Sequence, residues 1–243
     1  MNNNYTLNAL EQPVGEPVPN WIAPPFPPLQ TLNGRFCRVE PLNPDRDSQA
    51  LFEANSLDKD GRMWTYLPYG PFANFELYRS WLRVSVLTND PQFYVVIDLH
   101  TNQAVGIAAY LRIDPRNGSI EVGHLNFSPL MQRTPIATEA MYLMMRYAFE
   151  LGYRRYEWKC NALNAPSRRA AQRIGLSYEG VFRHATVTKG RNRDTAWYAA
   201  IDEEWPLLKA AFERWLAPAN FNNVGQQKES LSALTHPIVK NWG

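Results

Sequence analysis

The segment from Ser119 to Leu151 combines a strand pattern with a helix start, and this combination can bind phosphate groups. The sequence from Ser119 to Phe127 has a period of two, so that successive side chains would lie on opposite faces, and this predicts a strand. After a short turn, Thr134 and Pro135 predict a helix start, because threonine is a frequent N-cap and proline fits the first helical position. The free N–H groups and the positive dipole end of such a helix attract phosphate. Any strand–turn–helix unit has these features, so this segment alone is also compatible with a plain scaffold.

Composition excludes several classes of function. A net charge of +2 over 243 residues, without a run of Lys or Arg, argues against nucleic acid binding. Cys37 and Cys160 lie far apart and have no metal-ligand spacing, so we expect reduced, buried thiols and no metal. No apolar run approaches the length of a membrane span, and the polar N-terminus lacks the features of a signal peptide. We therefore expect a cytoplasmic protein that does not contact a membrane.

The chain divides into a folded unit between two arms. Residues 1–31 are rich in proline, which disfavours helices and strand ladders, yet they contain Trp21, Ile22 and Phe26. We expect this arm to lie as an extended strap across the domain or across a neighbouring subunit, which leaves a homodimer possible. Residues 32–216 carry the strong patterns, and residues 217–243 form a tail that we expect to act as a second strap.

Within the folded unit, hydrophobic periodicity predicts a mixed α/β domain. The predicted strands span residues 36–41, 93–99, 104–113, 119–127, 153–161, 176–182, 186–189 and 194–201. The predicted helices span residues 44–54, 74–89, 136–151, 168–174 and 202–216. Short turns join the three consecutive strands between residues 93 and 127, which indicates an antiparallel meander.

An aromatic, proline-rich stretch at residues 63–72 lies between two predicted helices. It contains Trp64, Tyr66, Tyr69 and Phe72. Aromatic faces on a stiff loop can form the wall of a pocket for an acceptor substrate. A loop packed into the core is an equally good interpretation of the same residues.

The order of elements and four segments resemble the GNAT acyltransferase superfamily, in particular the branch of RimJ/RimL-like ribosomal-protein alanine N-acetyltransferases. The resemblance covers residues 32–216. The segments that carry it are GSIEVGHLNFSP (118–129), MQRTPIATEAMYLMMRYAFE (131–150), NALNAPSRRAAQRIGLSYEGVFR (161–183) and RNRDTAWYA (191–199). It implies an α/β (α+β) fold with a central, mostly antiparallel twisted sheet of about seven strands, a splayed central pair, and helices on both faces.

The resemblance also implies an activity: acetyl transfer from acetyl-CoA to a primary amine by direct attack, without a covalent enzyme intermediate. The acceptor would be a protein N-terminus or a small-molecule amine, and the aromatic stretch would contact it. Two alternatives stay open. One is a non-catalytic acyl-CoA-binding or sensory relative, and the other is an interaction protein that assembles through its terminal arms.

In such enzymes, backbone N–H groups of the turn and helix start bind the pyrophosphate. The corresponding residues are Arg133, Thr134, Ile136, Ala137 and Thr138. Pro135 replaces the central glycine of the usual pattern, so we expect a weakened or re-aimed phosphate cradle. The pantetheine would run beside the exposed strand backbone of Leu125, Asn126 and Phe127.

The resemblance implies roles for Ser167 and Asn164, and the predicted central strand offers Glu121 and His124 as candidate bases. Acyl transfer needs a neutral amine and a proton for the leaving thiolate. Glu121 is the candidate general base, directly or through water, although a salt bridge explains it equally well, and His124 is a weaker candidate for that role. Ser167 is the candidate proton donor and also a candidate helix cap. Asn164 would bind the pantetheine or simply begin the following helix.

Overall fold

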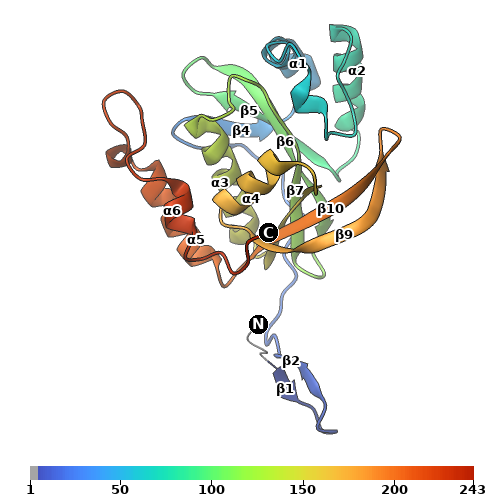
Figure 1. Ribbon diagram of the computed structural model, residues 1–243, viewed down its shortest axis with the longest axis vertical. Helices are drawn as coiled ribbons and strands as arrows, with labels where there is room; N and C mark the ends of the chain where they lie inside the picture. The colour runs from blue at the N-terminus through green and yellow to red at the C-terminus, as the bar shows by residue number, and fades with distance from the viewer. Residues whose placement is uncertain (1–4) are drawn as a thin grey trace.

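The computed structural model describes residues 5–243, and its centre is an eight-stranded sheet with one parallel pair (Figure 1). In spatial order the strands are β3 (Leu32–Asn33), β4 (Cys37–Pro41), β5 (Gln92–Asp98), β6 (Gln103–Asp114), β7 (Ser119–Phe127), β8 (Arg155–Asn161), β10 (Arg191–Ile201) and β9 (Ser177–Thr188). Neighbours are antiparallel except β7 and β8. The α/β class and the mostly antiparallel sheet are confirmed.

Helices cover both faces of this sheet (Figure 1). They are α1 (Pro44–Asn55), η1 (Arg62–Trp64), α2 (Phe75–Ser85), α3 (Pro135–Glu150), α4 (Ala165–Arg173), α5 (Trp205–Leu216), η2 (Pro218–Asn220) and α6 (Leu231–Thr235). The side chains of β5 alternate between two apolar clusters: Tyr94 and Val96 face the α3 side, while Phe93 and Val95 face α1 and α2. This two-fold alternation explains why β5 is almost continuously apolar.

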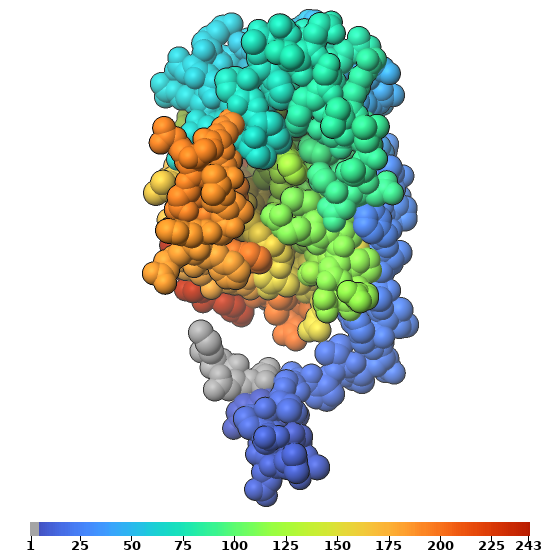
Figure 2. Space-filling model, turned by 90° about the vertical axis from the view of Figure 1, so that its right-hand side faces the viewer, coloured from blue at the N-terminus to red at the C-terminus, as the bar shows by residue number. Residues whose placement is uncertain are grey.

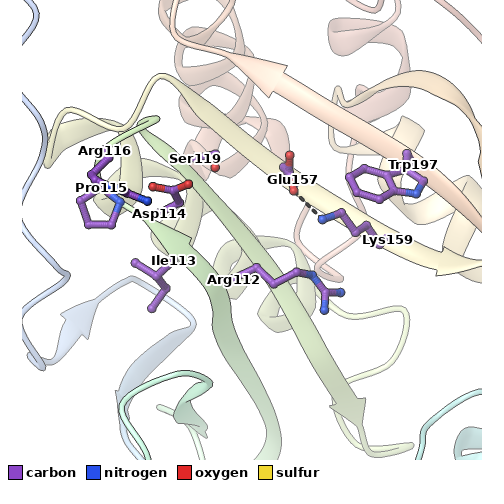
Figure 3. A pocket seen from close by; sticks show the side chains of 9 residues that line it. All are labelled: Arg112, Ile113, Asp114, Pro115, Arg116, Ser119, Glu157, Lys159 and Trp197. Carbon is purple, nitrogen blue, oxygen red and sulfur yellow. Dashed lines mark ion pairs between the residues drawn. The ribbon is translucent and has the colours of Figure 1, made fainter. Parts of the chain in front are cut away.

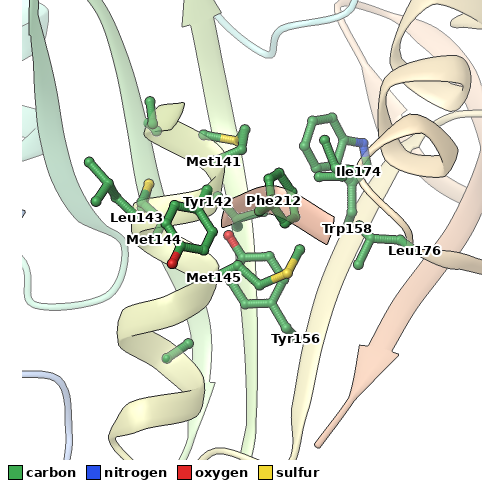
Figure 4. Close-up of a cluster of buried hydrophobic side chains, with 14 of the residues drawn as sticks. Met141, Tyr142, Leu143, Met144, Met145, Tyr156, Trp158, Ile174, Leu176 and Phe212 are labelled. Carbon is green, nitrogen blue, oxygen red and sulfur yellow. The ribbon is translucent and has the colours of Figure 1, made fainter. Parts of the chain in front are cut away.

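Helix α3 lies at the centre of the larger cluster. Figure 4 shows Met145 of this helix beside Tyr156 of β8, and the same cluster includes Met144, Trp158 of β8 and Phe212 of α5. Because both flanks of α3 are covered, most of its residues are buried. The predicted helix at residues 136–151 is therefore confirmed as a core element. No helix in residues 5–243 combines the length and apolar character that crossing a bilayer requires.

The structure departs most from the predicted elements at two places. The strands expected at 176–182 and 186–189 form one strand, β9, because the Asp194 carboxylate accepts from the backbone N–H of His184 at 2.7 Å across a bulge, and the ladder resumes beyond it. The helix expected at 74–89 ends at Ser85. The chain then turns back, and the Asp90 carboxylate accepts from the backbone N–H groups of Arg112 and Ile113.

The N-terminal arm has two parts. A hairpin of β1 (Tyr5–Leu7) and β2 (Pro13–Gly15) projects away from the domain, an exception to the prediction that proline prevents ladders in most of this arm (Figure 1). The following strap lies on the domain. Its carbonyl oxygens at Pro25 and Pro28 accept hydrogen bonds from Tyr153 and Tyr147 at 3.1 and 2.8 Å.

The C-terminal tail also lies on the domain. The backbone and side chain of Asn241 bond to the backbone of Tyr178 at the start of β9, and Leu231 of α6 is buried. The tail therefore adds side chains to the core, whereas the strap is held by hydrogen bonds at its surface, and the division at residues 31 and 217 stays a prediction.

One buried carboxylate joins α3 to the start of the sheet. The side chain of Glu139 is 3% exposed and accepts from the backbone N–H groups of Arg35, Phe36 and Cys37 at 2.6–2.8 Å. Together with burial, it raises the pKa of the Cys37 thiol far above its usual range. The interaction fixes the turn between β3 and β4 on the helix that carries the candidate phosphate site.

We predict that Glu139→Gln lowers the free energy of unfolding by about 2–3 kcal/mol, because an amide replaces a charged acceptor and turns its N–H₂ toward backbone donors. Urea denaturation measures this. Glu150→Gln, on the exposed side of the same helix, is the matched control and should change stability by less than about 0.5 kcal/mol. Equal effects of the two substitutions would contradict the role assigned to Glu139.

Candidate active-site cleft

The parallel pairing of β7 and β8 stops halfway along both strands. Register pairs run from Ser119–Arg155 to Val122–Trp158, and none follows, although β7 continues to Phe127. The cause is a bulge in β7: His124 has a φ of 51°, and the ladder to β6 places two β7 residues opposite one. The bulge bends β7 away from β8 and opens a gap between them.

A cleft of about 690 Å³ occupies this gap. Its walls come from β7, β8, the β9–β10 hairpin and the loop after η1, and Figure 2 shows the hollow between the orange hairpin and the teal and green segments. Two hydrogen bonds hold these walls together: Lys189 Nζ donates to the carbonyl of Trp64 at 2.8 Å, and Tyr66 Oη donates to the carbonyl of Leu163 at 3.2 Å. These two hydrogen bonds therefore connect walls of the cleft that come from different parts of the chain.

The α3 N-terminus has no side-chain cap. Thr134 occupies the N-cap position as predicted, but its hydroxyl donates to the carbonyl of Met131 at 2.7 Å and does not accept from the helix. Pro135 stands at the first helical position, where an N–H would lack a helical acceptor in any case, so the N–H groups of Ile136 and Ala137 stay available. Arg133 precedes them with a φ of 61°.

A cation lies beside the same helix turn. Arg173 of α4 donates from Nη1 to the Thr138 hydroxyl at 2.9 Å. Free N–H groups, the helix dipole and a guanidinium together suit a pyrophosphate. The site therefore fits the phosphates of a nucleotide despite Pro135.

Asn164 and Ser167 lie at the junction of β8 and α4, on the edge of the cleft. Asn164 is the N-cap of α4 and accepts from the backbone N–H of Ser167 at 3.2 Å, so the side chain performs the capping role that the sequence left open. The Ser167 hydroxyl accepts from Trp158 Nε1 at 3.0 Å. This contact uses an oxygen lone pair and leaves the hydroxyl hydrogen available to a ligand.

Glu121 is the centre of an ion-pair chain on the cleft floor. Its carboxylate is 2% exposed and accepts from Arg112 through Nε at 2.7 Å and Nη2 at 3.0 Å. Lys159 Nζ lies 3.0 Å from the same carboxylate and 2.7 Å from that of Glu157. The salt bridge that the sequence offered as an alternative to a general base is therefore present. Figure 3 shows the Lys159–Glu157 pair in a neighbouring hollow that shares Arg112 with the cleft.

The aromatic stretch splits between core and cleft. Trp64 is 5% exposed and packs with Phe72 in the cluster under α1 and α2, and neither residue lines the cleft, as the alternative of a loop packed into the core predicted. Tyr66 lines the cleft. Tyr69 reaches it indirectly: its hydroxyl lies 3.2 Å from His124 Nδ1, and the two rings stack.

The three strand residues that were predicted to lie beside the pantetheine differ in where their side chains lie. Leu125 lines the cleft. The Asn126 side chain is buried on the other side, where its Oδ1 accepts from Asn55 of α1 at 3.0 Å, and Phe127 packs against the larger core cluster. The side chains of these last two residues therefore do not face the gap, and the Phe127 carbonyl already accepts from Gln132 Nε2 at 2.7 Å.

The sequence interpretation missed three cations of the cleft, Arg112, Lys159 and Arg193. For Lys159 a signal existed, because charged residues alternate with Tyr156 and Trp158 along β8. Such alternation indicates a polar strand face, but not which cleft it lines. Among residues 5–243, no group of His, Cys, Asp and Glu side chains is arranged to hold a metal ion.

Comparisons with known proteins agree with this geometry. Residues 38–177 match the family model described as an acetyltransferase (GNAT) domain. A GCN5-related N-acetyltransferase structure from Brucella melitensis is 45% identical, with a TM-score of 0.88 over 90% of this chain and all of that one. An uncharacterized N-acetyltransferase, YnaD of Bacillus subtilis, is 27% identical over 66% of this chain and 91% of its own.

A more distant structure shares the fold. It is a RimL ribosomal-protein alpha-N-acetyltransferase in complex with coenzyme A, 19% identical, with a TM-score of 0.60 over 71% of this chain and 98% of that one. At this identity the similarity concerns the fold alone.

We predict that His124 makes stability fall as the solution is acidified. Burial, helped by the charge of Arg112, lowers the pKa of His124 from 6.5 to about 4. Between these values the unfolded chain binds a proton that the folded chain does not, so this stability is complete above pH 6.5 and is lost toward pH 4. His124→Asn keeps a residue that tolerates positive φ and should reduce the loss between pH 7 and pH 4 by roughly 2 kcal/mol. Urea denaturation at both pH values measures it; identical losses in the two proteins would refute the assignment.

Proposed function

The chain belongs to the GNAT acetyltransferase family, and we propose that it transfers an acetyl group from acetyl-CoA to a primary amine. The observation that carries the proposal is the break in β7–β8 pairing after Val122, next to the uncapped start of α3. An open strand edge and an anion site, side by side, suit a ligand with a diphosphate and a long amide-containing arm.

In this proposal the N–H groups of Ile136 and Ala137, with Arg133 and Arg173 nearby, hold the diphosphate. The backbone of Leu125, Asn126 and Phe127 forms hydrogen bonds with the pantetheine. Thr138 lies at the diphosphate end of this arm, and Asn164 lies at its thioester end. Acetyl-CoA supplies the acetyl group, activated as a thioester. The remaining chemistry belongs to residues of the cleft.

Ser167 is the proposed proton donor to the leaving thiolate. The bond from Trp158 Nε1 fixes its oxygen, and in this proposal its hydrogen donates to the sulfur of a thioester bound in the gap. The hydroxyl is thus oriented before a substrate binds.

Glu121 is the proposed proton acceptor, acting through water. It is the one carboxylate among the cleft-lining residues of the described chain. Its partners Arg112 and Lys159 are cations that disfavour a charged ammonium nearby and so help the acceptor amine to become neutral. Glu121 and the two cations thus both help to provide a neutral amine for the reaction.

A protein N-terminus or a small amine is the proposed acceptor, with Tyr66 and Tyr69 beside its binding space. A cytoplasmic location is part of the proposal, supported by the free thiols of Cys37 and Cys160, which a reducing compartment preserves. A non-catalytic acyl-CoA-binding relative would share the donor site, so turnover of an amine decides between the two.

We predict saturable binding of acetyl-CoA that depends on the α3 N–H groups. Ala137→Pro removes one proposed phosphate donor at a helix turn that tolerates proline and should weaken binding about tenfold, whereas Pro135→Ala should not weaken it. Titration calorimetry measures both variants, with ATP as an unrelated nucleotide. Wild-type protein that ignores acetyl-CoA and CoA would refute the donor site.

We predict that Ser167→Ala lowers kcat about 10²-fold while the affinity for acetyl-CoA stays within twofold, because only a proton transfer is lost. Ser167→Thr retains the hydroxyl and is the control. A thiol-release assay over a panel of amines provides the rates. Normal turnover by the alanine variant would exclude the donor role, and no turnover of any amine by wild type would favour a non-catalytic relative.

A further inference from the structure

The cleft contains more positive than negative charge. Its lining residues in the described chain include three cations, Arg112, Lys159 and Arg193, and one carboxylate, that of Glu121. Two of the cations already have partners: Arg112 contacts Glu121 through two nitrogens, and Lys159 contacts Glu121 and Glu157. Arg193 is therefore the cation whose charge is not balanced locally.

Arg193 has only a neutral partner. Its Nε donates to the Thr195 hydroxyl at 3.2 Å, and no carboxylate of residues 5–243 lies within 4.0 Å of its guanidinium nitrogens. The residue is half-buried on β10, beside the bulge between Arg193 and Thr195. A partly desolvated guanidinium without a counter-charge is unfavourable, and an anionic ligand would relieve this cost.

Its location relates the charge to the acceptor. Arg193 is on the hairpin wall, and the proposed diphosphate site at the start of α3 has its own cation in Arg173. Arg193 lines the same cleft as Cys160 of β8 and Glu121 of β7, which puts it near the junction of the gap and the cleft floor. An anionic group bound by Arg193 would thus lie in the cleft. In the same acceptor molecule, only a few covalent bonds would separate this group from an amine directed at the gap.

We infer that Arg193 forms a carboxylate-binding subsite in the acceptor cleft, so that the preferred acceptors are amines with a carboxylate a few bonds from the nitrogen. The inference rests on the proposed acetyl transfer and names its substrate class. A planar guanidinium binds carboxylate through two parallel hydrogen bonds, which fixes the orientation of the acceptor as well as its charge. The carboxylate has two sources: the α-carboxylate of a free amino acid, or an acidic side chain next to a peptide N-terminus.

The test compares matched acceptors. The acceptors are glutamate and its α-amide, and the peptide Ser-Glu-Ala-amide and its glutamine counterpart. We expect wild-type kcat/KM to favour the carboxylate member of at least one pair by tenfold or more. The pair that shows this preference identifies whether the carboxylate comes from a free amino acid or from a peptide side chain. Arg193→Gln should reduce that preference to below twofold while the neutral acceptor reacts as before. Arg193→Lys should restore part of it.

Arg191→Gln is the charge-matched control, because Arg191 is exposed on the same strand and does not line the cleft. It should retain the wild-type preference. The inference is overturned if wild type does not discriminate within either pair, if Arg193→Gln slows both members equally, or if Arg193→Gln weakens CoA binding and leaves the acceptor preference unchanged.

A binding readout separates this inference from the proposed reaction. The N-acetylated forms of the same four compounds are titrated into the CoA-bound protein, which requires no turnover. Tighter binding of the carboxylate forms, lost in Arg193→Gln, supports the subsite even if no amine is acetylated. Equal binding of both forms refutes the subsite even if acetylation is observed.

Discussion

The separation of β7 from β8 is the constraint on which the site depends. Both strands are paired on their outer sides, β7 to β6 around the bulge and β8 to β10 without interruption, so neither can move to close the gap without breaking another ladder. The positive φ of His124 sets the bend, and the contact with Tyr69 holds the imidazole in place. Backbone groups that a regular sheet would pair are thereby left to a ligand.

Electrostatics organise the two sides of this gap differently. On the α3 side, the helix start and Arg173 provide positive potential for a diphosphate. On the other side, the buried Glu121 carboxylate pairs with the buried Lys159 and with the more exposed Arg112, so loss of Glu121 would leave both cations short of a partner on the cleft floor. Arg193 is outside these ion pairs and is therefore available to a substrate.

Much of this architecture could be predicted from periodicity and end signals. The helix from residue 136 and the strand at 119–127 were placed correctly because one has a proline at its first position and the other alternates cleanly. The bulge at His124 could not be predicted, because positive φ is uncommon even for histidine and the kink depends on neighbouring strands. The burial of Trp64 could not be predicted for a similar reason. An aromatic loop residue packs into the core or lines a pocket according to the helices beside it. Ion pairs such as Glu121–Arg112 join residues whose proximity only the strand register defines.

The central claim is that coenzyme A occupies the gap between β7 and β8. A crystal structure of the protein with bound CoA tests it most directly. The account predicts the pantetheine along the backbone of β7 from Gly123 to Phe127, with the diphosphate oxygens within hydrogen-bond distance of the N–H groups of Ile136 and Ala137. CoA bound elsewhere, or a gap closed by regular β7–β8 pairing beyond Val122, would contradict it.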